Sequence, residues 1–348
     1  MLTWWYNAVE FNDFIKKDLF LFLLPNRALK REKEGIAMKK YFLGLVWVDK
    51  DHPVMHLKDY FNSNDEYFCV PDTFDFEKFS TKVCCGSINP LTREYFACRK
   101  IINKDQSQCY SCMHKYDFFN CIKCHGQECT AKDNEVISYC NTPHYVYLAY
   151  FSKDKIKVGT ASEIRKHDRL LEQGAIFSIF IAKTPTGKIA REIEKEIIDN
   201  GITGSVTTLF KMKNLIFDES MEDVKNELIK YYQLITRIVS KENSIYLIYP
   251  EFNCFTSILD KVKKHMLSET NQIDLFCMQS SKVNEYKILK DSSHVVGDFL
   301  FAVGKIIALS NDGVIQLCDS KKWEGFLVDF KNTTMFKAYE FGGKKHEK

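Results

Sequence analysis

Hydrophobic and polar positions alternate most regularly in the middle of the chain, between residues 142 and 205. Residues 145–151 form an apolar and aromatic run, residues 152–155 form a charged turn, and residues 156–158 form a second apolar run that is closed by Gly159. Two β-prone runs on either side of a short polar turn are typical of a β-hairpin. We therefore predict two paired strands here.

The segment after this hairpin predicts a helix, a strand and a second helix. Thr160 or Ser162 is a suitable N-cap for the first helix, and Gly174 is a suitable stop. The apolar run 176–182 predicts a third strand. The second helix is expected over 188–198, where isoleucines recur every four residues as on a buried helix face: Ile189, Ile193 and Ile197. The predicted order is ββαβα.

The flanking regions give weaker patterns. Residues 39–48 predict a strand, 54–80 are mixed and aromatic, 218–240 predict an amphipathic helix and 245–249 predict a strand. The last region alternates strand-like runs with turns, which predicts a small antiparallel sheet or barrel. The strand-like runs are 295–309, 314–318 and 326–330, and the clearest turn is Asn311–Asp312–Gly313.

A chain of 348 residues exceeds one typical domain of about 100–200 residues. We expect an α+β protein in which a zinc ribbon precedes the ββαβα unit and a small β domain follows. The expected divisions are an N-terminal extension (1–37), a β-rich segment (38–80), a cysteine-rich domain (81–141), the ββαβα domain (142–205), a connector of helix and strand (206–265) and a small β domain with a tail (266–348).

Residues 1–37 differ from the rest of the chain in their cluster of aromatic residues and their charged end. The triplet Lys33–Glu34–Gly35 lies a few codons before Met38, as a translated ribosome-binding site would. Translation is therefore expected to start at either Met1 or Met38.

The composition describes a globular protein that can bury sizeable cores: 45% hydrophobic, 14% aromatic and 27% charged residues. Lys and Arg total 49 against 46 for Asp and Glu, so a nucleic-acid partner would need a local basic surface. The longest apolar run near the start, residues 19–24, is far shorter than the ~20 residues of a membrane-spanning helix. We expect a cytoplasmic protein with no membrane partner.

Nine of the thirteen cysteines lie between Cys84 and Cys140. Such density arises either from a disulfide framework, which belongs to small secreted domains, or from metal ligation. The length, the ordinary composition and the lack of a secretory signal favour reduced cysteines that hold Zn²⁺. An iron–sulfur cluster is a third alternative.

The cysteine spacing suggests two metal sites. Cys109 and Cys112 form a Cys-x₂-Cys knuckle whose partners lie either upstream or downstream. We favour one site of Cys85, Cys98, Cys109 and Cys112, with Cys84 as the alternative to Cys85. A second site would use Cys121, Cys124 and Cys129 with either His125 or Cys140.

Such a ribbon either binds nucleic acid, here aided by Arg99 and Lys100, or only stabilises a domain too small for a core of its own. The absence of a His-x-Glu or His-Glu-x-x-His pattern argues against a catalytic zinc.

Basic residues exceed acidic residues over 153–192, by nine to five. This local excess could face phosphate groups. The candidates for such contacts are Lys157, Arg165, Lys166 and Arg169.

The same stretch resembles the GIY-YIG nuclease fold. The sequence Tyr145–Val–Tyr–Leu148 stands near the first signature and Lys157–Val–Gly159 at the second. The resemblance implies a tyrosine that acts as general base, a helix arginine (Arg169) that stabilises the phosphate and a glutamate (Glu194) that binds one divalent cation such as Mg²⁺. The fold's catalytic tyrosine falls near Val146, so Tyr145 or Tyr147 is the candidate, and strand alternation places both on the face opposite Val146.

A broader resemblance links the chain to an uncharacterised prokaryotic family that joins a cysteine-rich ribbon to a GIY-YIG-like unit. It covers roughly residues 84–330. The motifs that carry it include Cys109–Tyr–Ser–Cys112, Lys157–Val–Gly159, Glu172–Gln–Gly–Ala175, Glu194 and Gly304–Lys305.

Three functions are therefore considered. The first is a zinc-containing protein that binds structured RNA, such as tRNA or ribosomal RNA, mainly through phosphate and shape. The second is a Mg²⁺-dependent phosphodiesterase that uses Arg169 and Glu194 with Tyr145 or Tyr147. The third is a protein-interaction scaffold, which predicts neither salt-sensitive nucleic-acid binding nor metal-dependent cleavage. Without a functional role, Arg169 would pair with Glu172 or Asp168 on its helix, and Glu194 would face solvent.

Overall fold

The computed structural model describes residues 40–60, 65–116, 120–121, 124–217, 219–268, 282–290, 293–331 and 337–339. The chain divides into residues 1–39 and a unit from Lys40 to Lys348, and all that follows concerns this second unit. The expected extension 1–37 and the choice between Met1 and Met38 lie outside the described residues.

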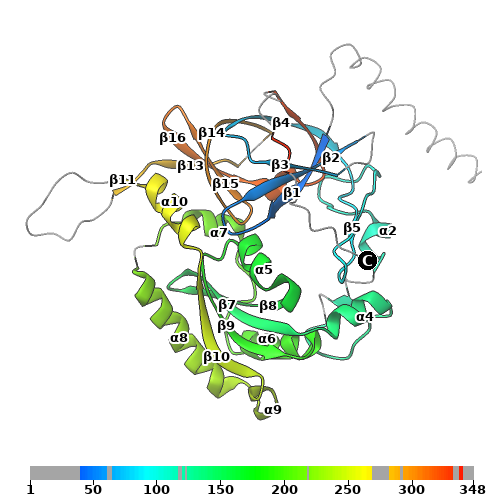
Figure 1. Cartoon of the computed structure of the whole chain (residues 1–348), viewed down its shortest axis with the longest axis vertical. Coiled ribbons are helices and arrows are strands. Elements are labelled where there is room, and N and C mark those ends of the chain that lie inside the picture. The colour runs from blue at the N-terminus through cyan, green and yellow to red at the C-terminus, as the bar shows by residue number, and fades with distance from the viewer. Residues whose placement is uncertain are drawn as a thin grey trace, which may run out of the picture. The chain divides into compact units, whose positions relative to one another are not determined.

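The larger of two main sheets has nine strands in the order β13-β16-β15-β14-β4-β17-β1-β2-β3 (Figure 1). Its neighbours are antiparallel except for β13 and β16, which are parallel. The strands are β1 (Lys40–Trp47), β2 (Pro53–Asp59), β3 (Asp65–Cys69), β4 (Thr73–Lys82), β13 (Tyr286–Ile288), β14 (His294–Val303), β15 (Ile306–Asn311), β16 (Val314–Asp319) and β17 (Phe326–Phe330).

Strands from both ends of the chain alternate within this sheet. β4 lies between β14 and β17, and β1 pairs with β17. The C-terminal strands therefore do not form the small separate sheet or barrel that the sequence predicts. The aromatic core explains the difference, because Phe76 of β4 packs 4.4 Å from the ring of Trp323 and 5.1 Å from that of Phe330, burying side chains that neither end could cover alone.

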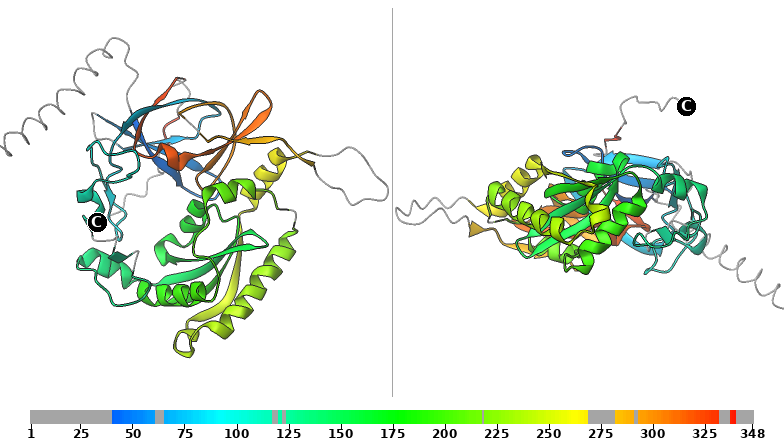
Figure 2. Two further views of the ribbon diagram at one scale, coloured as in Figure 1. Left: turned by 180° about the vertical axis from the view of Figure 1, so that it is seen from behind. Right: turned by 90° about the horizontal axis from the view of Figure 1, so that it is seen from below.

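The smaller sheet has four antiparallel strands in the order β10-β9-β7-β8. They are β7 (His144–Ser152), β8 (Lys155–Ser162), β9 (Phe177–Thr184) and β10 (Leu247–Cys254). Helices α6 (Gly187–Asp199) and α8 (Met221–Ile238) pack side by side against this sheet, as Figure 2 shows from behind. Helix α5 (Lys166–Gln173) contacts both β8 and β1 of the larger sheet.

The predicted order ββαβα is confirmed by β7, β8, α5, β9 and α6. A short 3₁₀ turn over Glu163–Arg165 precedes α5, and Gly174 ends that helix in the left-handed conformation with φ of 66°. The strand expected over 245–249 continues through Pro250 to Cys254. It can do so because β10 is an edge strand with a register shift between Leu247 and Glu251, where a proline is tolerated.

The cysteine-rich region contains short elements, and two further helices were not predicted from the sequence. The cysteine-rich elements are β5 (Ser87–Ile88), β6 (Tyr95–Phe96), α2 (Tyr110–Met113) and α4 (Asn134–Cys140). The two further helices are α7 (Thr208–Lys213) and α10 (Thr256–Met266), and a single helical turn, α9 (Lys241–Ser244), follows α8. No helix in the described ranges is long and apolar enough to cross a membrane.

Two glycines bring the sheets together. The Gly174 stop of α5 lies against the turn between β14 and β15, and a Cβ built on Gly304 of that turn would stand 2.7 Å from the Gly174 nitrogen. The Trp47 indole N–H donates to the Gly304 carbonyl at 3.2 Å. The backbones can meet this closely because neither glycine carries a side chain and both have positive φ. Lys305, the next residue, is thereby placed beside α5.

Candidate functional site

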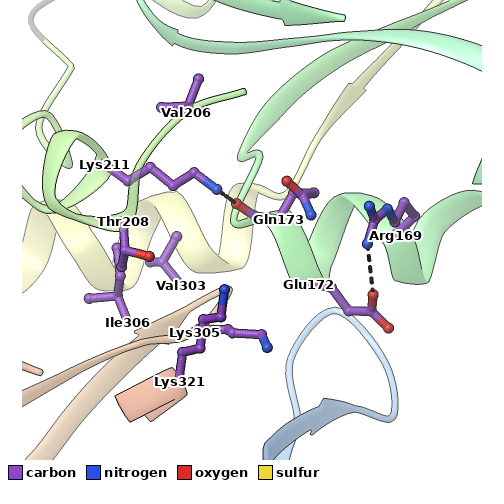
Figure 3. A pocket seen from close by; sticks show the side chains of 10 residues that line it. All are labelled: Arg169, Glu172, Gln173, Val206, Thr208, Lys211, Val303, Lys305, Ile306 and Lys321. Carbon is purple, nitrogen blue, oxygen red and sulfur yellow. Dashed lines mark hydrogen bonds and ion pairs between the residues drawn. The ribbon is translucent and has the colours of Figure 1, made fainter. Parts of the chain in front are cut away.

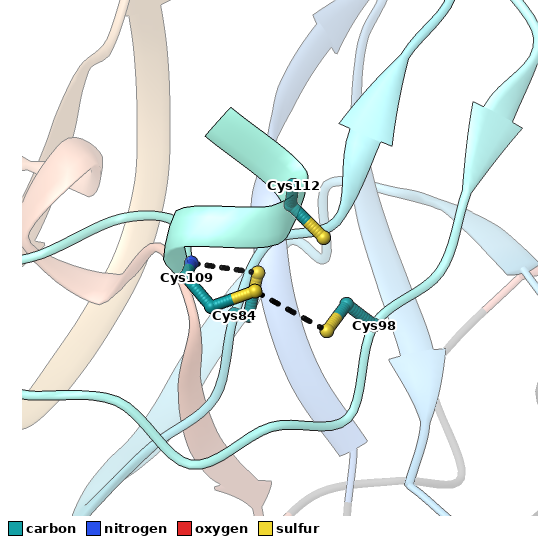
Figure 4. Close-up of side chains that lie close together, drawn as sticks. All are labelled: Cys84, Cys98, Cys109 and Cys112. Carbon is teal, nitrogen blue, oxygen red and sulfur yellow. Dashed lines mark hydrogen bonds between the residues drawn. The ribbon is translucent and has the colours of Figure 1, made fainter. Parts of the chain in front are cut away.

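Four cysteine thiols gather in the cysteine-rich region (Figure 4). Their sulfur atoms, from Cys84, Cys98, Cys109 and Cys112, all lie within 4.8 Å of one another. Cys109 precedes the single turn of α2 and Cys112 lies within it, so the Cys-x₂-Cys knuckle presents both sulfurs to one point. Burial raises the pKa of the Cys84 thiol, and the Cys109 N–H, which donates to the Cys84 sulfur at 3.2 Å, opposes that rise.

The sulfur spacing fits a metal centre better than a disulfide. Cys98 Sγ and Cys109 Sγ are 3.8 Å apart, whereas a disulfide bond is about 2.05 Å long. A tetrahedron with metal–sulfur bonds of ~2.3 Å has sulfur–sulfur edges of about 3.8 Å. The four residues could therefore hold one metal ion.

Cys84 occupies the place in this cluster that the sequence analysis favoured for Cys85. The Cys85 sulfur lies 3.2 Å from where a Gly325 Cβ would stand, on the side of the larger sheet. Burial raises the pKa of the Cys85 thiol to about 12, and the Glu324 carboxylate adds to the effect. Adjacent residues of an extended segment point in opposite directions, so only one of the pair reaches the cluster.

The other expected ligands lie around a second pocket, lined among others by Cys121, Cys124, Cys129 and Cys140. Cys121 and Cys140 are within hydrogen-bonding reach of each other. His125, a neighbour of these cysteines in the chain, is exposed and has a positive φ of 46°.

A different pocket, of about 340 Å³, lies between α5, α7 and the larger sheet (Figure 3). Its cationic lining comes from three segments far apart in the sequence. α5 contributes Arg169 and α7 contributes Lys211. Two connections of the larger sheet contribute Lys305, in the turn between β14 and β15, and Lys321, in the short 3₁₀ helix after β16. Among the described residues that line the pocket, Glu172 is the one carboxylate, and it lies 2.5 Å from Arg165 and 3.6 Å from Arg169. The pocket therefore carries an excess of positive charge and suits an anion.

Gln173 connects this pocket to β8. Its side-chain oxygen accepts a hydrogen bond from Lys157 Nζ at 2.7 Å, and its backbone carbonyl accepts one from Lys211 Nζ, also at 2.7 Å. Lys157 is buried, with 8% of its surface exposed. Burial and the nearby Arg169 lower the pKa of Lys157 to about 8, and burial with Lys157 and Arg169 lowers that of Lys211 to about 8. An anion bound beside these two lysines would therefore stabilise their protonated, charged forms.

Tyr147, Arg169 and Glu194 meet beside Lys157. The Tyr147 ring lies over Gly159, its partner on β8, and a Cβ on Gly159 would stand 2.5 Å from the tyrosine hydroxyl. The Arg169 guanidinium is within hydrogen-bonding reach of that hydroxyl, and the Glu194 carboxylate acts electrostatically on Tyr147 and Lys157. The glycine of the Lys157–Val–Gly159 motif therefore makes room for Tyr147.

Protonation states at this site follow from burial. Burial raises the pKa of Tyr147 to about 12, with Arg169 opposing the shift and Glu194 adding to it. Burial also raises the pKa of Glu194, while Arg191, Lys157 and Arg169 oppose it. At neutral pH the Tyr147 hydroxyl is therefore a hydrogen-bond donor rather than a phenolate.

The other residues expected at this site lie outside it. Tyr145 points toward Glu163, with 3.5 Å between the hydroxyl and the carboxylate. Arg165 is paired with Glu172, and Lys166 with Glu251 at 2.7 Å. Arg99 and Lys100 are exposed beside Cys98, within the cysteine-rich region.

Three cationic residues of the pocket were missed in the sequence analysis: Lys211, Lys305 and Lys321. Lys305 could have been found from the sequence, because it follows Gly304 in one of the motifs that carry the family resemblance. For Lys211 and Lys321 no local pattern distinguishes a lysine of the pocket from any other surface lysine, because tertiary packing brings them there.

Together these features define a mixed α+β protein with one large sheet, a four-cysteine cluster that could hold a metal ion and a separate cationic pocket. The family model described as "Protein of unknown function (DUF2797)" matches residues 73–328, and the chain belongs to this family. Comparisons with curated proteins and with solved structures give no match. The matched range includes both the cysteine cluster and the pocket.

Proposed function

We propose that this protein binds RNA through the cationic pocket and that the Cys84 cluster holds a zinc ion that stabilises the neighbouring fold. The observation that carries the proposal is the gathering of five cationic side chains from separate elements around one concave site: Lys157, Arg169, Lys211, Lys305 and Lys321. Like charges repel one another more strongly the closer they are held, so cations gathered this closely favour the binding of an anion between them. A backbone phosphate supplies it.

The shape of the site favours RNA over duplex DNA. The cations lie in a pocket bounded by α5, α7 and the larger sheet, which suits a phosphate of an unpaired strand better than the outside of a regular duplex. Structured RNAs such as tRNA and ribosomal RNA present unpaired loops and ends, and proteins recognise them largely through such contacts. The exposed Arg99 and Lys100 beside Cys98 offer a second contact area on the cysteine-rich region.

Binding of a fluorescent RNA hairpin at several salt concentrations tests this proposal. The double variant Lys157→Ala with Arg169→Ala should bind more weakly, and its slope of log K against log salt should be smaller by about 1–2, because each phosphate contact contributes ~0.7–0.9. Lys195→Ala, which removes an exposed lysine paired with Asp199 on α6, is the matched control. Equal affinity and slope in the double variant and the wild type would refute the site.

A second candidate function is Mg²⁺-dependent phosphodiester hydrolysis, because Tyr147, Arg169 and Glu194 meet at one place, as in the GIY-YIG fold that this region resembles. Glu194 is a carboxylate that could ligate Mg²⁺, whose role would be to offset charge on the reacting phosphate. The surrounding cations oppose a free divalent ion, so the phosphate would have to bind with it or before it. Arg169 would stabilise the phosphate, and the neutral Tyr147 hydroxyl would orient it or the attacking water by donating a hydrogen bond.

Glu194→Gln separates the two candidates. If the protein is a nuclease, this variant should lose roughly 10²–10⁴-fold in cleavage rate and keep its affinity for RNA. Cleavage that is unchanged in Glu194→Gln would exclude this mechanism. RNA binding by the wild type without Mg²⁺-dependent cleavage of RNA or DNA would leave binding as the function, and neither activity would favour a protein-interaction scaffold.

A further inference from the structure

The second group of cysteines surrounds the start of the helix that carries Glu194. Cys121, Cys124, Cys129 and Cys140 line one pocket together with Lys188 of the first turn of α6. Cys140 is the last residue of α4, and the other three precede that helix in the chain. The group shares no residue with the Cys84 cluster, and no three of its sulfur atoms lie within 4.8 Å of one another, so a bound ion would have to draw the four thiols together.

The environment of these thiols suits a metal–thiolate centre. Cys140 is within hydrogen-bonding reach of Cys121, of the Lys188 backbone N–H and of the Arg191 side chain. Arg191 also acts electrostatically on Cys121 and Cys124. A divalent ion with four thiolates has a net charge of −2, and N–H donors and cations beside the sulfurs are the usual means of stabilising it. Arg191 supplies a positive charge, Lys188 supplies its backbone N–H, and the N-terminus of α6 adds its dipole.

The loop that carries two of these thiols also packs directly on α6. Gly126 follows Cys124 by two residues, and a Cβ on it would stand 2.6 Å from the Glu192 nitrogen and 2.7 Å from the Glu192 Cα. This close approach depends on a glycine with φ of +77°. The turn is further closed by a hydrogen bond from the Gln127 N–H to the Cys124 carbonyl at 2.8 Å.

We propose that Cys121, Cys124, Cys129 and Cys140 hold a second zinc ion, which fastens the cysteine-rich region to the first turns of α6. Four soft thiolate ligands select zinc over hard divalent cations such as Mg²⁺. Cys140 is the fourth ligand rather than His125, because Cys140 lies beside Cys121 and lines the pocket. The ion would fix the beginning of α6, whose Glu192 contacts Gly126 and whose Glu194 lies at the catalytic candidate site. The second zinc ion would therefore hold Glu194 in place through the first turns of α6.

Native mass spectrometry and elemental analysis of the full chain test this proposal without any assay of activity. The wild type should carry two zinc ions, and Cys129→Ser and Cys140→Ser should each carry one. Cys69→Ser, which changes a partly buried cysteine of β3 outside both groups, is the control and should carry two. In addition, amides of residues 188–192 should exchange faster in Cys140→Ser than in the wild type.

Three results would overturn the proposal. One is a wild-type protein that carries a single zinc ion. This result would exclude the second site even if the variants fail to fold. Another is a mass 2 Da lower than expected with a disulfide between Cys121 and Cys140. The third is a Cys129→Ser variant that still holds two zinc ions. None of these results bears on RNA binding, because the cationic pocket shares no residue with the second group of cysteines.

Discussion

The Cys84 cluster and the cationic pocket are built in opposite ways. All four thiols of the cluster come from within residues 84–112, whereas the pocket gathers Arg169, Lys211, Lys305 and Lys321 from α5, α7 and two connections of the larger sheet. A metal ion bound at the cluster would neutralise part of the negative charge of the four thiolates. The pocket's charges repel one another until an anion enters. The cluster is therefore assembled locally, whereas the pocket is a product of the whole fold.

Removal of the metal ion from the Cys84 cluster should have the largest effect. In small structural sites, zinc binding contributes apparent free energies of about 10–16 kcal/mol to folding. We expect Cys109→Ser, or treatment with a strong chelator, to increase hydrogen exchange throughout residues 84–112 while β7, β8 and β9 remain protected. Cys85→Ser should retain the ion, since Cys85 points away from the cluster. An equal increase in hydrogen exchange in residues 84–112 and in strands β7, β8 and β9 would show that the two regions do not fold independently.

Gly304→Ala should damage the pocket through the junction of the two sheets. The new Cβ would stand 2.7 Å from the Gly174 nitrogen, so the variant combines a steric clash with the cost of a left-handed alanine, and we expect a loss of about 2–4 kcal/mol in the free energy of unfolding. Gly313→Ala is the control, because Gly313 also has positive φ but nothing lies within 4 Å of its Cβ position. It should cost only about 1–2 kcal/mol. Urea unfolding of the two variants measures the difference.

Anion binding at the pocket should weaken as the pH rises above 8. Lys157 and Lys211 both have pKa values lowered to about 8, and only their protonated forms attract phosphate. Affinity should therefore be constant below that pH and fall above it, by up to about tenfold per lysine for each further pH unit. Titration calorimetry with the RNA hairpin measures this dependence. Lys157→Arg, which stays charged, should show a smaller fall, and an affinity that is independent of pH from 7 to 10 would contradict the role of both lysines.

Lys321→Ala should have the smallest effect. Lys321 is exposed and lines the pocket, so its loss should leave the thermal midpoint unchanged and reduce the salt slope of RNA binding by about 1. Lys322→Ala is the neighbouring control, because Lys322 also is exposed but does not line the pocket. Equal effects of the two substitutions would indicate general surface charge rather than the pocket.

The local parts of the fold could be predicted from the sequence. The hairpin of β7 and β8, the stop at Gly174 and the isoleucine stripe of α6 depend on neighbours in the chain, and each lies where its pattern indicates. The density of cysteines likewise indicated a cluster that could hold a metal. The choice between Cys84 and Cys85 could not be made, because it depends on the direction in which an extended segment faces.

The long-range parts could not be predicted. The residues of β4 do not show that its partners are β14 and β17, more than 200 positions away. For the same reason we expected the two ends of the chain to form different domains. No pattern in the sequence indicated that Lys211 and Lys321 would line the same pocket as Arg169. Tyr147 was distinguished from Tyr145 only by the packing of its ring on Gly159.

The interleaved strands of the larger sheet impose an order on synthesis. β4 ends at Lys82 and its neighbour β14 begins at His294, so 212 positions separate the two in the chain. At ~5–20 residues per second, a ribosome needs about 10–40 s to cover that interval. During this time β4 lacks both of its neighbours in the sheet and β1 is paired only with β2, while the cysteine-rich region and the smaller sheet can already fold. The exposed edges of those first strands would then be the point at which a nascent chain most needs a chaperone.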